Sequence, residues 1–297
     1  MTPKISIIVL NWNNWPDTIA CVESIEKNVY ENYNIIIVDN NSEDSSEKIL
    51  RQKYPDKIFI QSGDNLGYAG GNNIGIEKAL SLKSDYILLL NNDTIVRHDF
   101  LQPLVNSFSL DEKIGIVSGK ILYLDEQPKI WYAGGKIDWL RGSGFSYGNK
   151  QIDNGQFDYN REVSFVSGCM MLIKREVIEN IKLLNEDYFL YLEDTEYCFR
   201  AIKAGYKLYY VHQSLIYHKV NEKEGRYAST IYYSTRNRLK FIRENAQFIY
   251  RALFPFFILI VFTMKIIVWI ISGKWLFINA FFRALKDAII GKYGHSE

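Results

Sequence analysis

Short apolar runs alternate with helical patterns through the first hundred residues, and this alternation limits the fold more than any other feature of the chain. The runs consist mostly of Ile, Val and Leu, as strands do when both faces of their sheet are covered. Strands that are separated by helices typically form a parallel sheet. We therefore expect strands at 5–10, 34–38, 58–62 and 86–90, with helices at 16–28, 45–53 and 71–82.

The second half of the chain has a less regular pattern, with strands expected near 115–123, 129–133 and 164–173. The glycine-rich stretch 134–148 between them predicts a mobile loop. A helix from the acidic residues near 193 to about Lys203, ended by Gly205, precedes a last strand at 207–211. The 297 residues leave room for one α/β catalytic domain, expected at 1–225, and a helical region at 226–297.

Polar clusters follow the predicted strands, at 11–14, 39–42, 63–73 and 91–93. The carboxyl ends of parallel strands meet at one edge of the sheet, where open α/β sheets bind their ligands. The sequence therefore predicts a ligand site at this edge.

Two of these clusters suggest a nucleotide. Asp39 follows a strand, where its carboxylate can accept hydrogen bonds from a base imide or a ribose hydroxyl, although an ordinary Asx turn is the alternative. The stretch 63–73 is a glycine-rich loop that leads into a helix, and the amino end of a helix attracts a pyrophosphate. Its spacing is neither that of the Rossmann motif nor that of the Walker A motif.

Asp93 is the best candidate for a metal ligand. It follows an apolar strand, and Mg²⁺ typically binds through one or two carboxylates plus phosphate oxygens. A helix N-cap is the alternative role for Asp93. His218 follows another apolar run and is a candidate for a second ligand or a diphosphate contact, although a histidine in that position is often structural.

Three carboxylates crowd into an aromatic stretch at Glu193, Asp194 and Glu196. Neighbouring carboxylates repel each other, so such crowding costs free energy. A chain tolerates this cost where one carboxylate acts as a base or meets a cation. The alternative is a solvated helical turn in which Glu196 pairs with Arg200 at i,i+4.

Six motifs in a fixed order then carry a family resemblance. They are Ile-Val-Leu-Asn-Trp-Asn (8–13), Ile-Val-Asp-Asn-Asn-Ser (37–42), Asn-Leu-Gly-Tyr-Ala-Gly-Gly-Asn-Asn (65–73), Leu-Leu-Asn-Asn-Asp-Thr (89–94), Val-Ser-Gly-Cys-Met-Met-Leu (166–172) and the Glu193-Asp194 pair, followed by His218. Over residues 4–220 the chain resembles family 2 glycosyltransferases. Within that family it is similar to the rhamnosyl- and galactofuranosyltransferase branch that builds bacterial polysaccharides.

The resemblance implies a GT-A fold and transfer of a sugar from a nucleoside diphosphate with inversion. It assigns the nucleoside to Leu10, Trp12 and Asp39, the donor pocket to Asn65, Gly70 and Asn92, a Mg²⁺ or Mn²⁺ ion to Asp93 and His218, and the base to Asp194. One departure concerns the family's Asp-x-Asp motif, which stands here as Asn91-Asn92-Asp93 with a single carboxylate. This departure implies a weaker metal site, or one that His218 completes.

The tail differs in composition from the rest of the chain. Between Arg236 and Lys292 there are ten Lys and Arg against two acids, a net of +8 in a chain whose total is +1. The apolar segment 253–272 is 20 residues long, which at ~1.5 Å per residue just spans a ~30 Å hydrocarbon core. However, Lys265 near its middle would cost about 2.5–3.5 kcal/mol. Both flanks are basic, which keeps both ends cytoplasmic.

A second helix at 275–290 has an apolar stripe opposite Arg283 and Asp287, formed by Ile278, Phe281, Phe282, Leu285 and Ile289. We therefore expect a helical hairpin in or on the inner leaflet, and a peripheral or monotopic protein on the cytoplasmic face of the cell membrane. A homodimer interface is the alternative role for these helices. Nucleic acid is not expected as a partner, because long Phe, Ile and Trp runs separate the basic residues.

Taken together, these features predict an inverting glycosyltransferase. It would move a sugar, with rhamnose as a candidate, from a dTDP- or UDP-linked donor to a lipid-linked or growing glycan. A nucleotidyltransferase is a second hypothesis, but it would carry a basic glycine-rich signature in the first loop, which 11–15 lacks. A non-catalytic scaffold that binds sugar nucleotides is a third. The three cysteines have no CxxC spacing and indicate neither a disulfide framework nor a zinc site.

Overall fold

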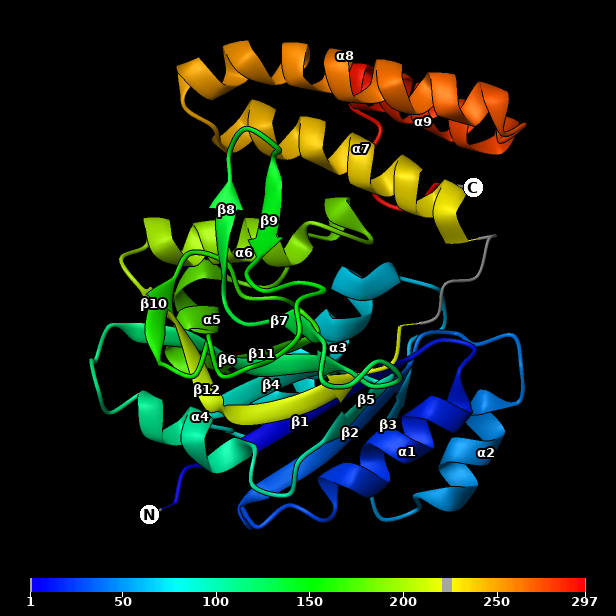
Figure 1. The fold of residues 1–297 in the computed structure, drawn as a ribbon. Helices are drawn as coiled ribbons and strands as arrows, with labels where there is room; N and C mark the ends of the chain where they lie inside the picture. Colours follow the sequence, from blue (N-terminus) through cyan, green and yellow to red (C-terminus); the bar gives the residue numbers. More distant parts are fainter. Residues whose placement is uncertain (1, 221–225, 297) are drawn as a thin grey trace.

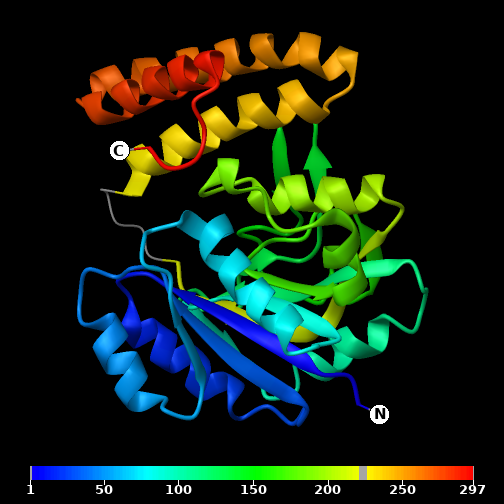
Figure 2. The same ribbon diagram turned by 180° about the vertical axis from the view of Figure 1, so that it is seen from behind.

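The computed structural model describes residues 2–220 and 226–296, and it contains a mostly parallel sheet with helices on both faces beneath a layer of three long helices (Figures 1 and 2). The four strands expected in the first half are confirmed as β1 (Ile5–Asn11), β2 (Tyr33–Asp39), β3 (Ile58–Gln61) and β4 (Tyr86–Asn91). They run parallel in the order β4-β1-β2-β3. Asn11 pairs with Asp39 and Leu10 with Asn91, so the polar strand ends meet at one edge.

Three helices cover this part of the sheet, namely α1 (Trp15–Ile25), α2 (Ser46–Lys53) and α3 (Gly67–Ser81). α1 buries Cys21, Val22 and Ile25, as its apolar spacing predicts. α3 begins at Gly67, four residues earlier than expected. Gly67 has a φ of +69°, and a Cβ there would overlap the carbonyl oxygen of Phe189, so this start requires glycine.

The second half extends the sheet to the order β10-β12-β6-β11-β4-β1-β2-β3, with β11 antiparallel to β4 and β6. Its elements are β5 (Thr94–Val96), α4 (Leu101–Ser107), β6 (Ile114–Tyr123), β7 (Ile130–Tyr132), β8 (Gly135–Asp138), β9 (Ser143–Ser146), β10 (Arg161–Val163), β11 (Met170–Lys174), α5 (Arg175–Ile181), the 3₁₀ turn η1 (Glu186–Tyr188), α6 (Glu193–Lys203) and β12 (Lys207–His218).

Three expectations for this half are corrected. The strand predicted at 164–173 begins only at Met170, as β11, because residues 164–169 form a turn that follows the short strand β10. The stretch 134–148 is not a mobile loop, because it contains the antiparallel hairpin β8–β9. Its glycines let Phe165 pack against the hairpin, since a Cβ on Gly135 or Gly144 would meet the Phe165 ring. β12 continues beyond residue 211 to His218, after an irregularity between Val211 and Leu215.

The tail forms three helices, α7 (Arg226–Asn245), α8 (Phe248–Ile271) and α9 (Trp275–Ile290), which lie together at one end of the molecule (Figure 1). α8 is long and apolar enough to cross a membrane, judged by length and composition within the residues described. α9 packs along α7, and the Tyr232 hydroxyl donates to Asp287 Oδ2 at 2.6 Å. Asp287 is therefore buried. This differs from the exposed polar face that its position opposite the apolar stripe suggested.

α7 is packed against the catalytic body. Trp139, in the turn of the β8–β9 hairpin, stacks on Phe241 of α7 with ring centroids 5.4 Å apart. Arg236 is fully buried and donates to the carbonyls of Asp187 and Gly294, at 3.2 and 2.8 Å. The boundary at 225 stays a prediction, and these contacts show that α7 packs with the residues on both sides of it.

Candidate active site

The strand ends of β1 and β2 form a closed polar network around Asp39. This buried carboxylate accepts hydrogen bonds from Asn11 Nδ2 (2.7 Å), Gln61 Nε2 (2.8 Å), and both the amide and the hydroxyl of Ser42 (3.1 and 2.6 Å). Four donors fill the acceptor positions of a carboxylate. A nucleoside can therefore reach Asp39 only where one of these donors gives way.

The amino end of α3 does not offer free amides to an anion. The amides of Tyr68 and Ala69 donate to Phe189 O, at 2.7 and 3.4 Å, and that of Gly67 donates to Asn65 Oδ1 at 3.0 Å. The Leu66 amide donates to the side-chain oxygen of the asparagine that follows β2. The pyrophosphate position suggested by the glycine-rich loop is thus corrected, because the protein itself uses the N–H groups that would bind it.

The remaining predicted donor residues lie around the same edge. Leu10 is half-buried against α3, where a Cβ on Gly71 would come 2.5 Å from its Cδ1. Trp12 is 48% exposed just beyond β1. Asn92 Nδ2 donates to Thr18 of α1 at 2.9 Å and remains partly exposed. Asn65 also lies on this edge, whereas Gly70 is buried in α3 against Leu66.

Asp93 and His218 are brought together by strand pairing. β5 pairs with the end of β12, and the amide of Lys219 donates to Asp93 O at 2.8 Å. His218 Nε2 then lies 3.1 Å from Asp93 Oδ1. The alternative of Asp93 as a helix N-cap is excluded, because a strand follows it.

The donor atoms of this pair fit a divalent cation. Asp93 Oδ1 is closed to solvent and has no hydrogen-bond partner, and the distance to His218 is not accompanied by hydrogen-bond geometry. Carboxylate oxygen suits Mg²⁺ and Mn²⁺, and imidazole nitrogen is also a metal ligand. Residues 2–220 and 226–296 contain no group of three His, Cys, Asp or Glu placed to hold a metal, so further ligands would have to come from substrate or water.

The acidic cluster begins α6, and its three carboxylates have different surroundings. Asp194 is partly exposed, with Oδ2 accepting from the Gly168 amide (3.1 Å) and Oδ1 from the Thr195 amide (2.6 Å). Glu193 is buried, and its Oε2 has no partner. Glu196 pairs with Arg200 at 2.8 Å, so the ordinary i,i+4 role is correct for this residue alone.

These surroundings affect the pKa values of Glu193 and Asp194 in different ways. Burial raises the pKa of Glu193 well above its usual range, and the adjacent Asp194 charge raises it further. Burial also raises the pKa of Asp194, but hydrogen bonds from Gly168 and Thr195 stabilise its anion and oppose the rise. Of the two, Asp194 is thus the carboxylate whose anion the protein stabilises by hydrogen bonds, whereas Glu193 Oε2 has no partner.

The turn at 167–169 connects the acidic cluster with the strand edge. The Asn91 amide at the end of β4 donates to Cys169 O at 3.0 Å, and the Tyr68 hydroxyl donates to Gly168 O at 2.6 Å. Burial raises the pKa of Tyr68, and the charges of Glu193, Asp194 and Asp93 add to the rise. Tyr68 therefore lies within the electrostatic reach of both Asp93 and Asp194.

The turn before Asp194 has a strained backbone. Phe189, Tyr191 and Leu192 have φ values of 54°, 68° and 70°, in the left-handed region that disfavours such side chains. Buried Asn237 of α7 holds this turn, because its Nδ2 lies 2.7–3.0 Å from the carbonyls of Tyr188, Leu190 and Tyr191. The sequence did not identify Asn237, although a short amide inside a helix was a usable signal.

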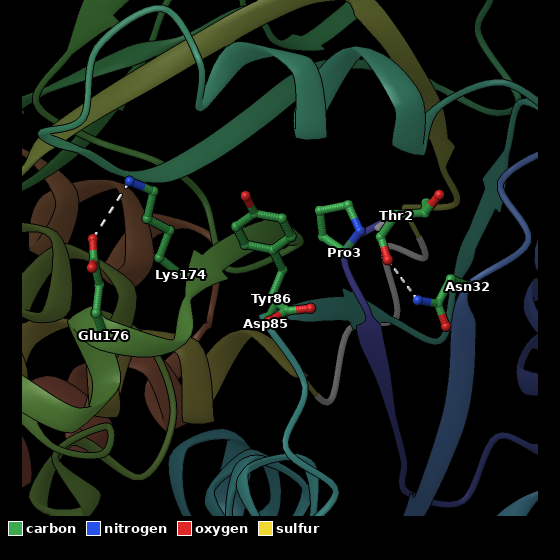
Figure 3. A pocket seen from close by; sticks show the side chains of 7 residues that line it. All are labelled: Thr2, Pro3, Asn32, Asp85, Tyr86, Lys174 and Glu176. Atoms are coloured by element: carbon green, nitrogen blue, oxygen red, sulfur yellow. Dashed lines mark hydrogen bonds and ion pairs between the residues drawn. The ribbon is translucent and has the colours of Figure 1, made fainter.

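A hollow at the opposite edge of the sheet is not part of this site. Figure 3 shows its lining, which is formed by Thr2, Pro3, Asn32, Asp85, Tyr86, Lys174 and Glu176. Lys174 pairs with Glu176 at 3.4 Å, and Asn32 donates to the Thr2 carbonyl at 2.7 Å. The hollow lies where β1 and β4 begin, at the other end of these strands from the polar clusters.

Comparison with known proteins finds relatives that match most of this chain. The low-salt glycan biosynthesis hexosyltransferase Agl10 of Haloferax volcanii is 30% identical over 258 residues, which are 84% of this chain and 78% of that protein. The N-acetylglucosaminyl-diphospho-decaprenol L-rhamnosyltransferase of Mycobacterium tuberculosis is 20% identical over 76% of this chain and 79% of that protein.

A crystal structure of GalNAc-T7 with UDP, GalNAc and Mn²⁺ superimposes with a TM-score of 0.62 at 18% identity. The match covers 75% of this chain and 44% of that one, so this chain spans less than half of that structure. At this identity the likeness establishes the fold alone, a GT-A type sheet. The family model of glycosyl transferase family 2 matches residues 6–182, and this chain belongs to that family.

Proposed function

We propose that the protein is an inverting glycosyltransferase that moves rhamnose from a dTDP- or UDP-linked donor to a lipid-linked or growing glycan at the cytoplasmic face of the cell membrane. Three things support this proposal, namely the family, a relative named as a rhamnosyltransferase acting on a diphospho-decaprenol, and an apolar helix compatible with membrane association. One observation carries the proposal. Asp93 lies next to His218, and Asp93 and Asp194 are both near Tyr68.

The strand edge would bind the donor. In this proposal, Leu10 and Trp12 contact the base, and Asp39 contacts the nucleoside after losing one of its four donors. Asn65, Gly70 and Asn92 belong to the wall of the donor pocket. Asp93 and His218 would hold Mg²⁺ or Mn²⁺, because Asp93 Oδ1 is closed to solvent, has no hydrogen-bond partner and lies 3.1 Å from His218 Nε2. Such a cation stabilises the negative charge that develops on the leaving diphosphate.

Asp194 would act as the base. Its anion is held in place by the Gly168 and Thr195 amides, so Oδ2 keeps its orientation while it takes the proton of the acceptor hydroxyl. The raised pKa of Glu193 favours its protonated form, which avoids repulsion between the two carboxylates. Attack by that hydroxyl on the face opposite the diphosphate inverts the anomeric carbon.

The test is a panel of nucleotide sugars with Mg²⁺ or Mn²⁺. Thermal stabilisation of the full chain by one donor identifies the sugar and base, since a ligand at 100 times its Kd stabilises by about 2.7 kcal/mol. Release of the nucleoside diphosphate is then measured with and without acceptor. A chain that binds a donor but never releases the diphosphate would be a scaffold, and the proposal would be wrong.

A further inference from the structure

Arg238 of α7 is a partly buried cation with no partner among the residues that the structure describes. Its Nε is closed to solvent and donates no hydrogen bond. Across residues 2–220 and 226–296, the guanidinium forms neither an ion pair nor a hydrogen bond. Partly buried arginines are normally paired, because a charge that loses hydration without gaining a partner is costly. An unpaired one therefore suggests an anion that binds from outside.

The neighbours of Arg238 are also cations. Burial lowers the pKa of its guanidinium, and the positive charge of Arg141 in the β8–β9 turn lowers it further. Lys265 of α8 is close enough for its charge to interact with Arg238 as well. The negative charge of Asp138 offsets part of this lowering of the Arg238 pKa. However, Asp138 already accepts from the Arg141 amide at 3.0 Å and lies 3.5 Å from Arg141 Nε. We call Arg141, Arg238 and Lys265 the cation cluster.

The cation cluster lies where the hairpin turn meets the tail. A Cβ on Gly142 would come 2.8 Å from Ile242 of α7 and 3.0 Å from Phe254 of α8, so this turn packs against both helices. Ile242 is one helical turn beyond Arg238 and shares its face of α7. Arg238 therefore points to the side of α7 that the hairpin and α8 cover.

The same elements lead to the acidic cluster. The Gly144 amide in β9 donates to Thr195 Oγ1 at 3.2 Å, and Thr195 contacts Asp194 directly. Asn237, next to Arg238 in the chain, holds the Tyr191 carbonyl at 2.8 Å, three residues before Asp194. The hairpin and α7, which carry two members of the cation cluster, thus contact both the acidic cluster and α8.

That surface suits a hydrocarbon chain. α8 exposes a set of large apolar side chains, namely Phe248, Ile249, Leu253, Phe256, Leu259, Ile260, Met264, Ile267, Val268, Ile270 and Ile271. A ligand that joins an apolar chain, a strongly anionic centre and a sugar hydroxyl would match α8, the cation cluster and Asp194 in that order.

We propose that the cation cluster binds the diphosphate of a lipid-linked acceptor, an inference that rests on the proposed function. Guanidinium and ammonium groups bind phosphate oxygens through charge-assisted hydrogen bonds, and the guanidinium matches them with two parallel donors. The lipid chain lies along α8, and the first sugar beyond the diphosphate reaches Asp194.

The test measures flotation of the full chain with phosphatidylcholine vesicles that contain decaprenyl diphosphate. A second set of vesicles carries phosphatidylglycerol at equal total charge. Arg238→Met should weaken binding to the diphosphate vesicles by about 10- to 100-fold, as expected for loss of charge-assisted hydrogen bonds, and should leave phosphatidylglycerol binding within about twofold. Arg238→Lys should recover part of the loss. Lys286→Met, which removes an exposed cation of α9, is the control and should bind as the unmodified chain does.

Removal of an unpaired, partly buried charge should leave thermal stability equal or higher, so lost binding in Arg238→Met would not reflect unfolding. Unchanged binding to diphosphate vesicles overturns the proposal. An equal loss on both kinds of vesicle also overturns it, and assigns the cation cluster to phospholipid headgroups. Donor hydrolysis without acceptor tests the proposed function separately, because it needs no lipid.

Discussion

The strand edge of β1–β4 and the wall formed by α6 and α7 meet near Tyr68, but they are built in opposite ways. At the strand edge polar groups satisfy each other, as the four donors around Asp39 show, and Asp93 Oδ1 is an exception. The helical wall contains a left-handed turn at 189–192 and the unpaired Arg238. Under the proposed function, the strand edge would bind the donor with side chains that are already held in place, whereas the wall would depend on contacts from the tail to position Asp194.

The largest effect is expected at the wall. Asp194→Asn should lower transfer by about 10²–10⁴-fold, the usual contribution of a general base, while donor affinity stays within about threefold. Transfer by the unmodified chain should also fall as pH drops through the pKa of Asp194, which burial raises above 3.8, because only the anion accepts a proton.

Steady-state kinetics and donor calorimetry measure both quantities. Glu112→Gln, an exposed carboxylate away from the site, is the control. Near-normal turnover by Asp194→Asn would refute this assignment of the base.

The matching change at the strand edge is Asp93→Ala. It should weaken donor binding in the presence of Mg²⁺ or Mn²⁺ by more than about 100-fold, since no other carboxylate lies at that strand end. His218→Ala should weaken it less, because imidazole is the second member of the pair. Calorimetry with and without metal measures the donor affinity of both variants. The same donor affinity in both conditions for Asp93→Ala would place the cation elsewhere.

Asn237→Ala tests whether α7 positions the base. Loss of its contacts to the carbonyls of Tyr188, Leu190 and Tyr191 should let the turn relax and lower kcat by about 10- to 100-fold. Donor KM should stay unchanged, because the strand edge does not contact this side chain. Asn245→Ala, whose side chain bonds only within its own helix, is the matched control. If kcat and donor KM changed together, the role of Asn237 would be general stability.

The apolar surface of α8 should matter for membrane attachment and not for donor binding. Replacing Phe256, Leu259 and Ile260 with Gln should reduce flotation with anionic vesicles by at least about tenfold, because each buried side chain contributes about 1.5–3 kcal/mol. High salt should weaken attachment of the unmodified chain without abolishing it. Leu110→Gln, an exposed apolar site on the body, is the control. A triple variant that still floats normally but loses a dimer would identify α8 as an oligomer interface.

The smallest effect is expected for Glu193→Gln. Because the pKa of Glu193 is raised in the folded chain, its contribution to stability is complete below the ordinary value of 4.5 and is lost as pH rises through the folded value. The variant should therefore match the unmodified chain near pH 4.5 and melt a few degrees higher at pH 8. Melting curves across this range measure the difference, and a variant that is less stable at pH 8 would show that Glu193 is ionised in the fold.

Most of the sheet was predictable because its signals are local. Continuous apolar runs and the polar residues after them identified β1 to β4, and strand pairing then placed Asn11 beside Asp39. The hairpin β8–β9 was missed because its glycines indicate flexibility in the sequence, while in the fold they make room for Phe165. The conformational freedom of a glycine does not tell which side chain packs against it in the folded protein.

The sequence by itself determined the class of fold, the family and the candidate carboxylates, since these follow from periodicity and from motifs in fixed order. Only the tertiary structure decided how they are used. It joined Asp93 to His218 across β5 and β12, and it occupied the amides of α3 with the Phe189 carbonyl. It also placed Asn237 of α7 beside the turn that precedes Asp194. These are contacts between residues far apart in the chain, and no local pattern encodes which distant partner a side chain meets.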